Sequence, residues 1–463
     1  LALAGRSPQN GPGPRRPELA TVWGPVDTLP ETEDCLTLHL WTPGLGNGLD
    51  GAKRPVMIWL HGGAFSYGSA NVPRFDGTNL AARQDVVVVA VNHRLNVFGH
   101  LHLADIGGER FAHSGNAGVL DLIAALDWVR EHAARFGGDP GNVTLFGQSG
   151  GGGKISTLLA MPAARGLFHR AIVQSGATIR VAERARATMM AEAVLKQLGI
   201  GRHDLDRLQA VPLAQLKAAI APAERTLPPS PWPLLDRYPL GPVVDGADLP
   251  RHPFDPDAPA TGAGVPLMIG DTKDEMAIFL AGDDPVWFRT LTEADLRERV
   301  RAVAGEAADD LLARYGERHP GMSPAERLIA ILTDSHFRVR SLMLAERKAA
   351  QAAPVWLYSL DWETAAHEGR LKSPHSVDTP LVFDTVDRCG PSTEGPAAAA
   401  LAGTLSATWA AFARTGDPNG PALPAWPAFR PEAPCAMHFD TVCGTAPVAA
   451  DDPRRTWAAI ASA

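Results

Sequence analysis

The chain has 463 residues, of which 45% are hydrophobic and 20% are charged, and its formal net charge is −8. The negative balance argues against nucleic acid and anionic membranes as partners, and no apolar run approaches the length of a membrane-spanning helix. The four cysteines, at 35, 389, 435 and 443, match neither a disulfide framework nor a metal-ligand spacing, so we expect free thiols and no metal. The sequence begins at Leu1 without a signal-peptide pattern, and it predicts neither localisation nor oligomeric state.

Apolar periodicity predicts alternating strands and helices along the chain. The run 86–91 is continuously apolar and β-branched, as in a strand buried on both faces, and 118–136 has helical spacing. The other expected strands are 36–41, 55–60, 143–146, 171–174, 265–270, 354–360 and 435–439. The other helical patterns cover 154–161, 183–216, 293–350 and 401–414. Length alone suggests about three domains, but this alternation favours one dominant α/β core, a mostly parallel sheet with helices on both faces.

The proline-rich stretch 222–259 is expected to be a loop that carries Trp232, Tyr238 and Phe254. These aromatic side chains either pack in the interior or line a substrate gorge. The pattern does not separate the two possibilities.

The most informative stretch is Gly147-Gln148-Ser149-Gly150-Gly151, which follows the short apolar strand 143–146. A Gly-x-Ser-x-Gly turn between a strand and a helix is the context of a nucleophile elbow, where the glycines make room for a strained serine. The turn 138–142 precedes the strand, and a helix is expected from Lys154 onward. A glycine-rich turn with an incidental serine is the alternative, and the flanking strand and helix favour the catalytic interpretation.

A nucleotide-binding loop is excluded by the spacing of the same residues. A phosphate-binding loop needs a glycine, four further residues and then Gly-Lys-Ser or Gly-Lys-Thr. Here Gly153-Lys154 is followed by Ile155, and Gln148 stands where the first glycine is required.

A second glycine-rich turn, His61-Gly62-Gly63-Ala64-Phe65, follows the expected strand 55–60. Small residues at the end of a strand let backbone N–H groups point into a pocket, where they can hold an oxyanion. An ordinary glycine turn is the alternative, but the elbow makes the functional interpretation stronger. The strand 171–174 also ends in a small polar residue, Ser175, which we expect beside the site.

The residues themselves leave several candidates for the two partners of a nucleophilic serine. The chain has 15 histidines and 51 acidic residues. Among the histidines His336 and His367 rival His375, and among the acids Asp271 and Asp274 rival Glu275. Periodicity does not decide between them.

Taken together, the motifs resemble the type-B carboxylesterases of the α/β-hydrolase superfamily, a family that includes cholinesterases, bacterial para-nitrobenzyl esterases and the non-catalytic neuroligins. The resemblance covers nearly the whole chain, and the residues that carry it are Glu33-Asp34-Cys35-Leu36, His61 to Phe65, Asn92 to Leu95, Phe136 to Pro140, Gly147 to Gly151, Leu167 to Ile172, Asp274-Glu275 and Ala413 to Asn419. It implies a single α/β-hydrolase domain over 1–463, with insertions at 177–260 and 281–350 around the pocket.

The resemblance also implies a catalytic triad in the chain order Ser149, Glu275, His375. In such a triad the histidine takes the serine proton and later protonates the leaving alcohol, while the acid fixes the histidine's tautomer. The oxyanion hole is then formed by the backbone N–H groups of Gly63, Ala64 and Gly150, with Gln148 and Ser175 as supporting residues. The implied partner is a small-molecule ester, and no cofactor is required.

Several positions depart from the family pattern. Gln148 replaces the usual glutamate and removes a negative charge near the histidine, which makes choline esters poor candidates. Gly150 replaces an alanine, and Met276 replaces a glycine beside Glu275, where it narrows the pocket. Ser7 stands where a partner cysteine for Cys35 is expected, so that bridge is absent, and the family's N-terminal hairpin region has no counterpart in the given sequence.

Three functions are compatible with these motifs. A serine hydrolase that cleaves carboxylic esters through an acyl-enzyme fits best. The same machinery serves amide, carbamate or thioester hydrolysis, and the motif does not exclude it. A non-catalytic binding module is disfavoured because Ser149, Glu275 and His375 are all present.

Overall fold

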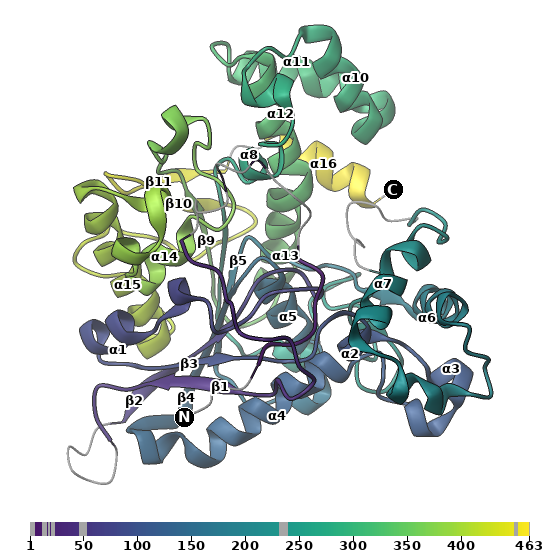
Figure 1. Cartoon of the computed structure of the whole chain (residues 1–463). Helices are drawn as coiled ribbons and strands as arrows, with labels where there is room; N and C mark the ends of the chain where they lie inside the picture. Colours follow the sequence, from purple (N-terminus) through teal and green to yellow (C-terminus); the bar gives the residue numbers. More distant parts are fainter. Residues whose placement is uncertain are drawn as a thin grey trace.

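The computed structural model describes residues 5–11, 16, 19, 24–45, 53–230, 239–448 and 452–462, except the side chains of 453, 461 and 462. Within these residues a central sheet of nine strands has the order β1-β3-β2-β4-β5-β8-β9-β10-β11 (Figure 1). The pairs from β3 to β10 are parallel, and the edge strands β1 and β11 are antiparallel to their neighbours. The expected mostly parallel sheet is therefore confirmed.

The strands follow the buried apolar runs of the sequence. Their bounds are β1 Leu38–Trp41, β2 Arg54–Leu60, β3 Val87–Val91, β4 Gly138–Gln148, β5 Arg170–Gln174, β8 Leu267–Thr272, β9 Val355–Leu360, β10 Cys435–Phe439 and β11 Gly444–Pro447, and a separate pair joins β6 Ala182–Glu183 to β7 Val243–Val244.

Helices cover both faces of the sheet, as Figure 1 shows. Their bounds are α1 Thr78–Gln84, α2 Asn96–His100, α3 Ala104–Gly107, α4 Ala117–His132, α5 Gly150–Leu158, α6 Arg184–Leu198, α7 Leu213–Glu224, α8 Met276–Phe279, α9 Asp284–Trp287, α10 Glu293–Ala304, α11 Ala308–Arg318, α12 Pro324–Thr333, α13 Val339–Ala349, α14 Asp378–Phe383, α15 Pro396–Thr415 and α16 Pro453–Ser462. A π-helical turn, Asp334–Arg338, joins α12 to α13.

Side chains that alternate along each strand divide the interior into two cores. In β2, Ile58 and Leu60 pack with residues of α4, α5 and α13 on one face. Met57 and Trp59 point to the other face, where they pack with residues of α1, α14 and α15. Both faces of the strand are apolar because both are covered, which explains the continuous hydrophobic runs in the sequence.

The carboxyl ends of the parallel strands lie along one edge of the sheet, and the site residues follow them. Ser149 comes directly after β4, and Ser175 directly after β5. Glu275 follows β8, His61 follows β2, and His375 lies in the connection between β9 and α14. Parallel topology therefore gathers residues that are far apart in the chain.

Two local predictions were wrong. The helix expected from Lys154 begins at Gly150, directly after the nucleophilic turn, because close packing against the sheet outweighs the low helix propensity of glycine. The turn expected at 138–142 belongs to β4, where Gly138 pairs with Arg54 of β2.

Other expectations have mixed outcomes. The predicted helical stretch 183–216 contains α6 and the start of α7, separated by a 3-10 segment. Phe254 is fully buried in the core and does not line the main cavity. Trp232 and Tyr238 lie outside the described residues.

Two further expectations concerned the cysteines and membrane-spanning helices. All four cysteines are free thiols, as expected. Ser7, which stands where a partner cysteine was expected, hydrogen-bonds to Cys35 instead. In the described part of the chain, no helix combines the length and the apolarity that crossing a bilayer requires.

Candidate active site

Ser149 occupies a strained turn between β4 and α5. Its φ is 57° and its ψ is −123°, a conformation that non-glycine residues rarely adopt. Its backbone N–H donates to the carbonyl oxygen of Gln174 at 2.7 Å, which ties the turn to β5. The half-buried serine lines the main cavity, which has a volume of about 950 Å³. This is the geometry of a nucleophile elbow.

His375 and Glu275 form a buried pair at the same edge of the sheet. Nδ1 of His375 donates to Oε2 of Glu275, whose side chain is fully buried. The other carboxylate oxygen of Glu275 accepts the backbone N–H of Thr272 at 2.8 Å. Since Nδ1 carries the proton, Nε2 of the neutral ring is left as the basic nitrogen.

The rival acids do not reach His375. Asp271 instead accepts a hydrogen bond from Ser341 at 2.9 Å, and burial together with the nearby charge of Glu275 raises the pKa of Asp271 to about 7. Asp274 accepts the backbone N–H of Ser373 at 3.3 Å, and burial raises its pKa.

The rival histidines are also placed elsewhere. Nδ1 of His336 pairs with the hydroxyl of Ser335 at 2.7 Å, although the residue lines the cavity. His367 packs against Trp287, with 5.8 Å between the ring centroids. Of the candidates, only His375 is paired with Glu275 in the described structure.

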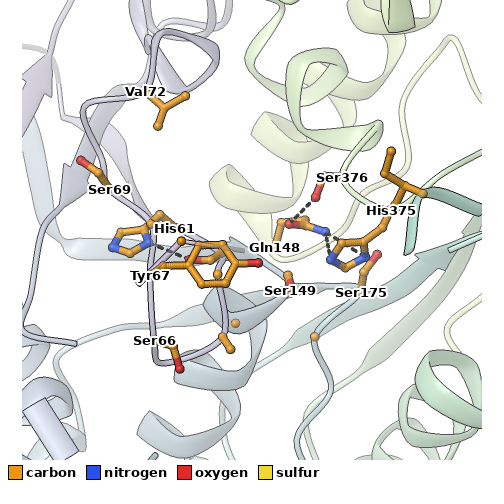
Figure 2. A pocket seen from close by; sticks show the side chains of 18 of the residues that line it. His61, Ser66, Tyr67, Ser69, Val72, Gln148, Ser149, Ser175, His375 and Ser376 are labelled. Carbon is orange, nitrogen blue, oxygen red and sulfur yellow. Dashed lines mark hydrogen bonds between the residues drawn. The ribbon is translucent and has the colours of Figure 1, made fainter. Parts of the chain in front are cut away.

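Gln148 contacts the catalytic candidate His375 directly (Figure 2). Its amide nitrogen lies 3.1 Å from Nε2 and 3.4 Å from Nδ1 of the ring. Its amide oxygen accepts a hydrogen bond from the hydroxyl of Ser376 at 3.0 Å, which fixes the orientation of the amide. Between the described residues, no hydrogen bond joins Oγ of Ser149 to His375. A proton transfer from the serine therefore requires a small rearrangement of the ring or of Ser149.

The oxyanion candidates lie in the turn after β2 and at the first residue of α5. Gly63 and Ala64 adopt positive φ values of 88° and 54°, and the carbonyl oxygen of Gly63 accepts the N–H groups of Ser66 and Tyr67, each at 3.1 Å. In the described part of the chain, the N–H groups of Gly63, Ala64 and Gly150 donate to no protein acceptor. They are therefore available to a ligand in the cavity that all three residues line.

Ser175 lines the same cavity as Ser149 and His375, and it also has a strained conformation, with φ of 51°. Its backbone N–H donates to the carbonyl of Gly270 at 2.8 Å, so the residue bridges β5 and β8. Its hydroxyl is buried and makes no hydrogen bond to another described residue. It lines the cavity together with Met276, the residue expected to narrow the pocket near Glu275.

Two aromatic residues that were not anticipated complete the wall next to His375. The centroids of the Phe279 and Phe337 rings lie 5.0 and 4.9 Å from the imidazole centroid, and the two phenylalanines stack on each other at 6.0 Å. Phe279 follows Glu275 by four residues, about one turn of a helix, so the sequence could have predicted that its side chain lies near that of Glu275. Phe337 lies in the π-helical turn, which the sequence did not predict.

The site contains no cluster of metal ligands among the described residues. Its chemical components are a strained serine, a histidine oriented by a buried carboxylate, and a group of available backbone N–H donors. This arrangement, on a mostly parallel sheet with the serine between strand and helix, defines an α/β-hydrolase.

Comparison with known proteins identifies the family. Residues 6–447 match the carboxylesterase family, and the chain belongs to it. It is 36% identical over 405 residues to a para-nitrobenzyl esterase of Bacillus subtilis, covering 87% of this chain and 78% of the relative. It is 33% identical over 439 residues to the phenmedipham hydrolase of Pseudarthrobacter oxydans, covering 92% and 83%.

Solved structures agree with this assignment. A Geobacillus stearothermophilus carboxylesterase at pH 6.2 superposes with a TM-score of 0.78 at 37% identity, covering 95% of this chain and 88% of the other. A thermophilic PNB esterase gives a TM-score of 0.80 at 32% identity, covering 98% and 89%.

Proposed function

We propose that the chain is a serine esterase that hydrolyses carboxylic esters through an acyl-enzyme on Ser149. The observation that carries the proposal is the buried pair of His375 and Glu275 next to a serine in a nucleophile elbow. Membership of the carboxylesterase family supports the same reaction class.

In the first half-reaction, Nε2 of His375 accepts the proton of Ser149 as Oγ attacks the ester carbonyl. The carbonyl oxygen becomes an oxyanion, which the N–H groups of Gly63, Ala64 and Gly150 stabilise. A single donor of this kind typically contributes about 3 kcal/mol to the transition state. His375 then returns the proton to the leaving alcohol, and the acyl group remains on Ser149.

In the second half-reaction, water takes the place of the alcohol. His375 accepts a proton from the water, which attacks the acyl-enzyme, and the acid is released as Ser149 recovers its proton. Glu275 holds the proton on Nδ1 and stabilises the imidazolium in both steps. Gln148 and Ser175 are supporting residues, and the contact of Gln148 with the imidazole supports that role.

We also propose that the chain forms a single domain and that its segment 281–350 forms part of the pocket wall. His336, Phe337 and Arg340 of this segment line the cavity, which supports this assignment. From the segment 177–260, Thr178 lines the cavity.

The proposal is tested by hydrolysis of para-nitrophenyl esters of graded acyl length, with Ser149→Ala measured in parallel. We expect the variant to lose roughly 10⁴-fold or more in kcat. Mass spectrometry after treatment with an organophosphate should show one adduct on the parent and none on the variant. A folded parent without activity, or a variant that retains it, would overturn the proposal. Matched amide substrates decide whether the machinery extends beyond esters.

A further inference from the structure

Lys154 is a buried lysine that the proposed reaction does not use. It lies in the first turns of α5, and its side chain is 0% exposed. Its ammonium group donates to the carbonyl oxygen of His61 at 2.8 Å and lies 5.9 Å from the centre of the Phe65 ring. His61 and Phe65 are the first and last residues of the glycine-rich turn that carries Gly63 and Ala64. The lysine thus joins the nucleophile helix to the oxyanion turn.

The carbonyl groups of this turn are held one after another. The His61 carbonyl accepts from Lys154, and the Gly62 carbonyl accepts from Nδ1 of the His61 ring at 2.8 Å. The Gly63 carbonyl accepts from two backbone N–H groups further along the turn. With these three carbonyls fixed, the orientation of the following N–H groups is fixed as well, because each peptide unit is planar. Lys154 provides the first of these anchors.

No opposite charge compensates the ammonium. Between the described residues, its single hydrogen-bond acceptor is a neutral carbonyl, and it makes no ion pair. Around it lie three buried histidines, and burial together with the charge of Lys154 holds the pKa of His61 and His93 well below the ordinary value. Burial lowers the pKa of the third, His100, to about 4. These imidazoles are therefore neutral at pH 7. Burial lowers the pKa of Lys154 itself to about 7, so at that pH the side chain is present both as the ammonium and as the neutral amine.

The position of the lysine is also unfavourable for its own helix. A cation near the N-terminus of a helix opposes the helix dipole, and an uncompensated buried charge is costly. The same placement, however, adds positive potential where the N-terminus of α5 and the oxyanion turn meet. That is where the negative oxygen of the tetrahedral intermediate is expected to form.

We propose that Lys154 is a positioning residue of the oxyanion hole, which anchors the His61–Phe65 turn to the nucleophile helix and, in its ammonium form, strengthens the positive field on the intermediate. This inference rests on the proposed esterase function. It also gives a role to the Gly153-Lys154 pair, which has the wrong spacing for a phosphate loop.

The test compares Lys154→Met, which removes both the charge and the donor, with Lys154→Gln, which retains a donor. Lys348→Met is the matched control, because Lys348 is another buried lysine, bonded to the carbonyl of Ala263 at 3.1 Å and to Gln351 at 2.9 Å, away from the cavity lining. The measurements are kcat and KM for a para-nitrophenyl ester, the inhibition constant of a trifluoromethyl ketone, and the melting temperature. The ketone reports on the oxyanion hole because its adduct with serine carries the same oxyanion.

For Lys154→Met we expect kcat to fall by about tenfold to a hundredfold while KM changes less than about threefold. Ketone affinity should fall in parallel, without a matching loss of thermal stability. Lys154→Gln should recover part of both losses, and Lys348→Met should leave kcat and ketone affinity unchanged.

Parental kcat and ketone affinity in Lys154→Met would overturn the inference, as would a loss shared equally by Lys348→Met. If Lys154→Met does not fold, Lys154→Gln decides: parental kcat and ketone affinity overturn the inference, and a parallel loss of both supports it. An inactive parent or an active Ser149→Ala variant contradicts the esterase function itself, so the two failures are distinguishable.

Discussion

The backbone of Ala64 occupies the space into which a side chain at residue 150 would project. A Cβ atom on Gly150 would lie 2.2 Å from the carbonyl oxygen, 2.4 Å from the Cα and 2.5 Å from the nitrogen of Ala64. The oxyanion turn and the start of α5 are therefore in contact through their main chains. The alanine that is usual in the family at this position does not fit this placement of the turn.

Gly150→Ala should therefore displace the turn and misalign the Gly63 and Ala64 N–H groups. We expect kcat to fall by about tenfold to a hundredfold, with a smaller change in KM, because these donors act mainly in the transition state. Steady-state kinetics with a para-nitrophenyl ester measures both. Gly264→Ala is the control, since a Cβ there would meet nothing within 4 Å. Equal kcat in parent and Gly150→Ala would show that the turn is free to move away.

A comparison of Glu275→Gln with Asp271→Asn should show which of the two carboxylates supports His375 in the reaction. The glutamine no longer holds the proton on Nδ1 of His375, so we expect kcat to fall by roughly 10³- to 10⁴-fold. Asp271→Asn, which alters a carboxyl that is bonded to Ser341 instead, should cost less than about tenfold. The comparison requires only kcat for the two folded variants. A larger loss in Asp271→Asn than in Glu275→Gln would reverse the assignment.

Gln148→Glu should change the pH dependence of the reaction. The amide nitrogen of Gln148 lies 3.1 Å from Nε2 of His375, and a carboxylate in its place favours the charged form of the imidazole, which cannot accept the proton of Ser149. The acid limb of the kcat/KM profile should therefore move to higher pH, by about one unit. Gln351→Glu, which adds the same charge away from the cavity, should leave the profile in place. Superimposable profiles for Gln148→Glu and the parent would contradict the contact.

The rings of Phe279 and Phe337 beside His375 predict a preference for esters with an aromatic leaving group. In the proposed mechanism His375 protonates the leaving alcohol, and we therefore expect that alcohol on the side of Phe279 and Phe337, whose rings contact the imidazole. Ring contacts of this kind contribute about 0.5–1.5 kcal/mol. Phe337→Leu should therefore lower kcat/KM for phenyl acetate by about two- to tenfold relative to ethyl acetate. Phe288, which is exposed and outside the cavity lining, supplies the control variant Phe288→Leu. An unchanged ratio in Phe337→Leu would place the alcohol elsewhere.

A fifth prediction concerns stability. Asp378 is fully buried, with an oxygen that accepts from Gln174 at 2.6 Å, and burial raises its pKa from 3.8 to about 6. Below pH 3.8 the carboxyl is protonated in the folded and the unfolded states. Between pH 3.8 and 6 the carboxyl ionises in the unfolded state but keeps its proton in the folded state, so stability falls as the pH rises, and above pH 6 the loss levels off at about 3 kcal/mol.

Asp378→Asn removes this penalty while retaining an acceptor for Gln174. The melting temperature of the variant should exceed that of the parent at pH 8, and the difference should shrink towards pH 4. Asp387→Asn, an exposed position, should show no such trend. A difference that is constant with pH would mean that the carboxyl is not the source of the effect.

The fold and part of the site could be predicted from the sequence because their signals lie in short, continuous stretches of the chain. Strands such as β3 were found because both of their faces are buried, and the elbow was found because its glycines and serine are adjacent in the chain. The pairing of His375 with Glu275 depends on how distant loops meet, and it was expected only from the family resemblance.

Other features could not be anticipated. Phe337 reaches His375 because it lies in a π-helical turn, which no sequence pattern predicted. Helix α5 starts early, at Gly150, because packing against the sheet outweighs the low helix propensity of glycine. The exposure of Phe254 was left open because a loop pattern does not say which side chains turn inward.

The four glycines that open α5 have a consequence for how enzymes of this kind can diversify. A Cβ on Gly151 would lie 1.9 Å from the Leu60 carbonyl, and one on Gly152 would lie 2.9 Å from the Cα of Gly176. Variation at these positions would separate the serine from the sheet that holds it. We therefore expect substitutions that change the substrate range to be tolerated better at the rim of the cavity, at positions such as 279 and 337, than at residues 151 and 152 of α5.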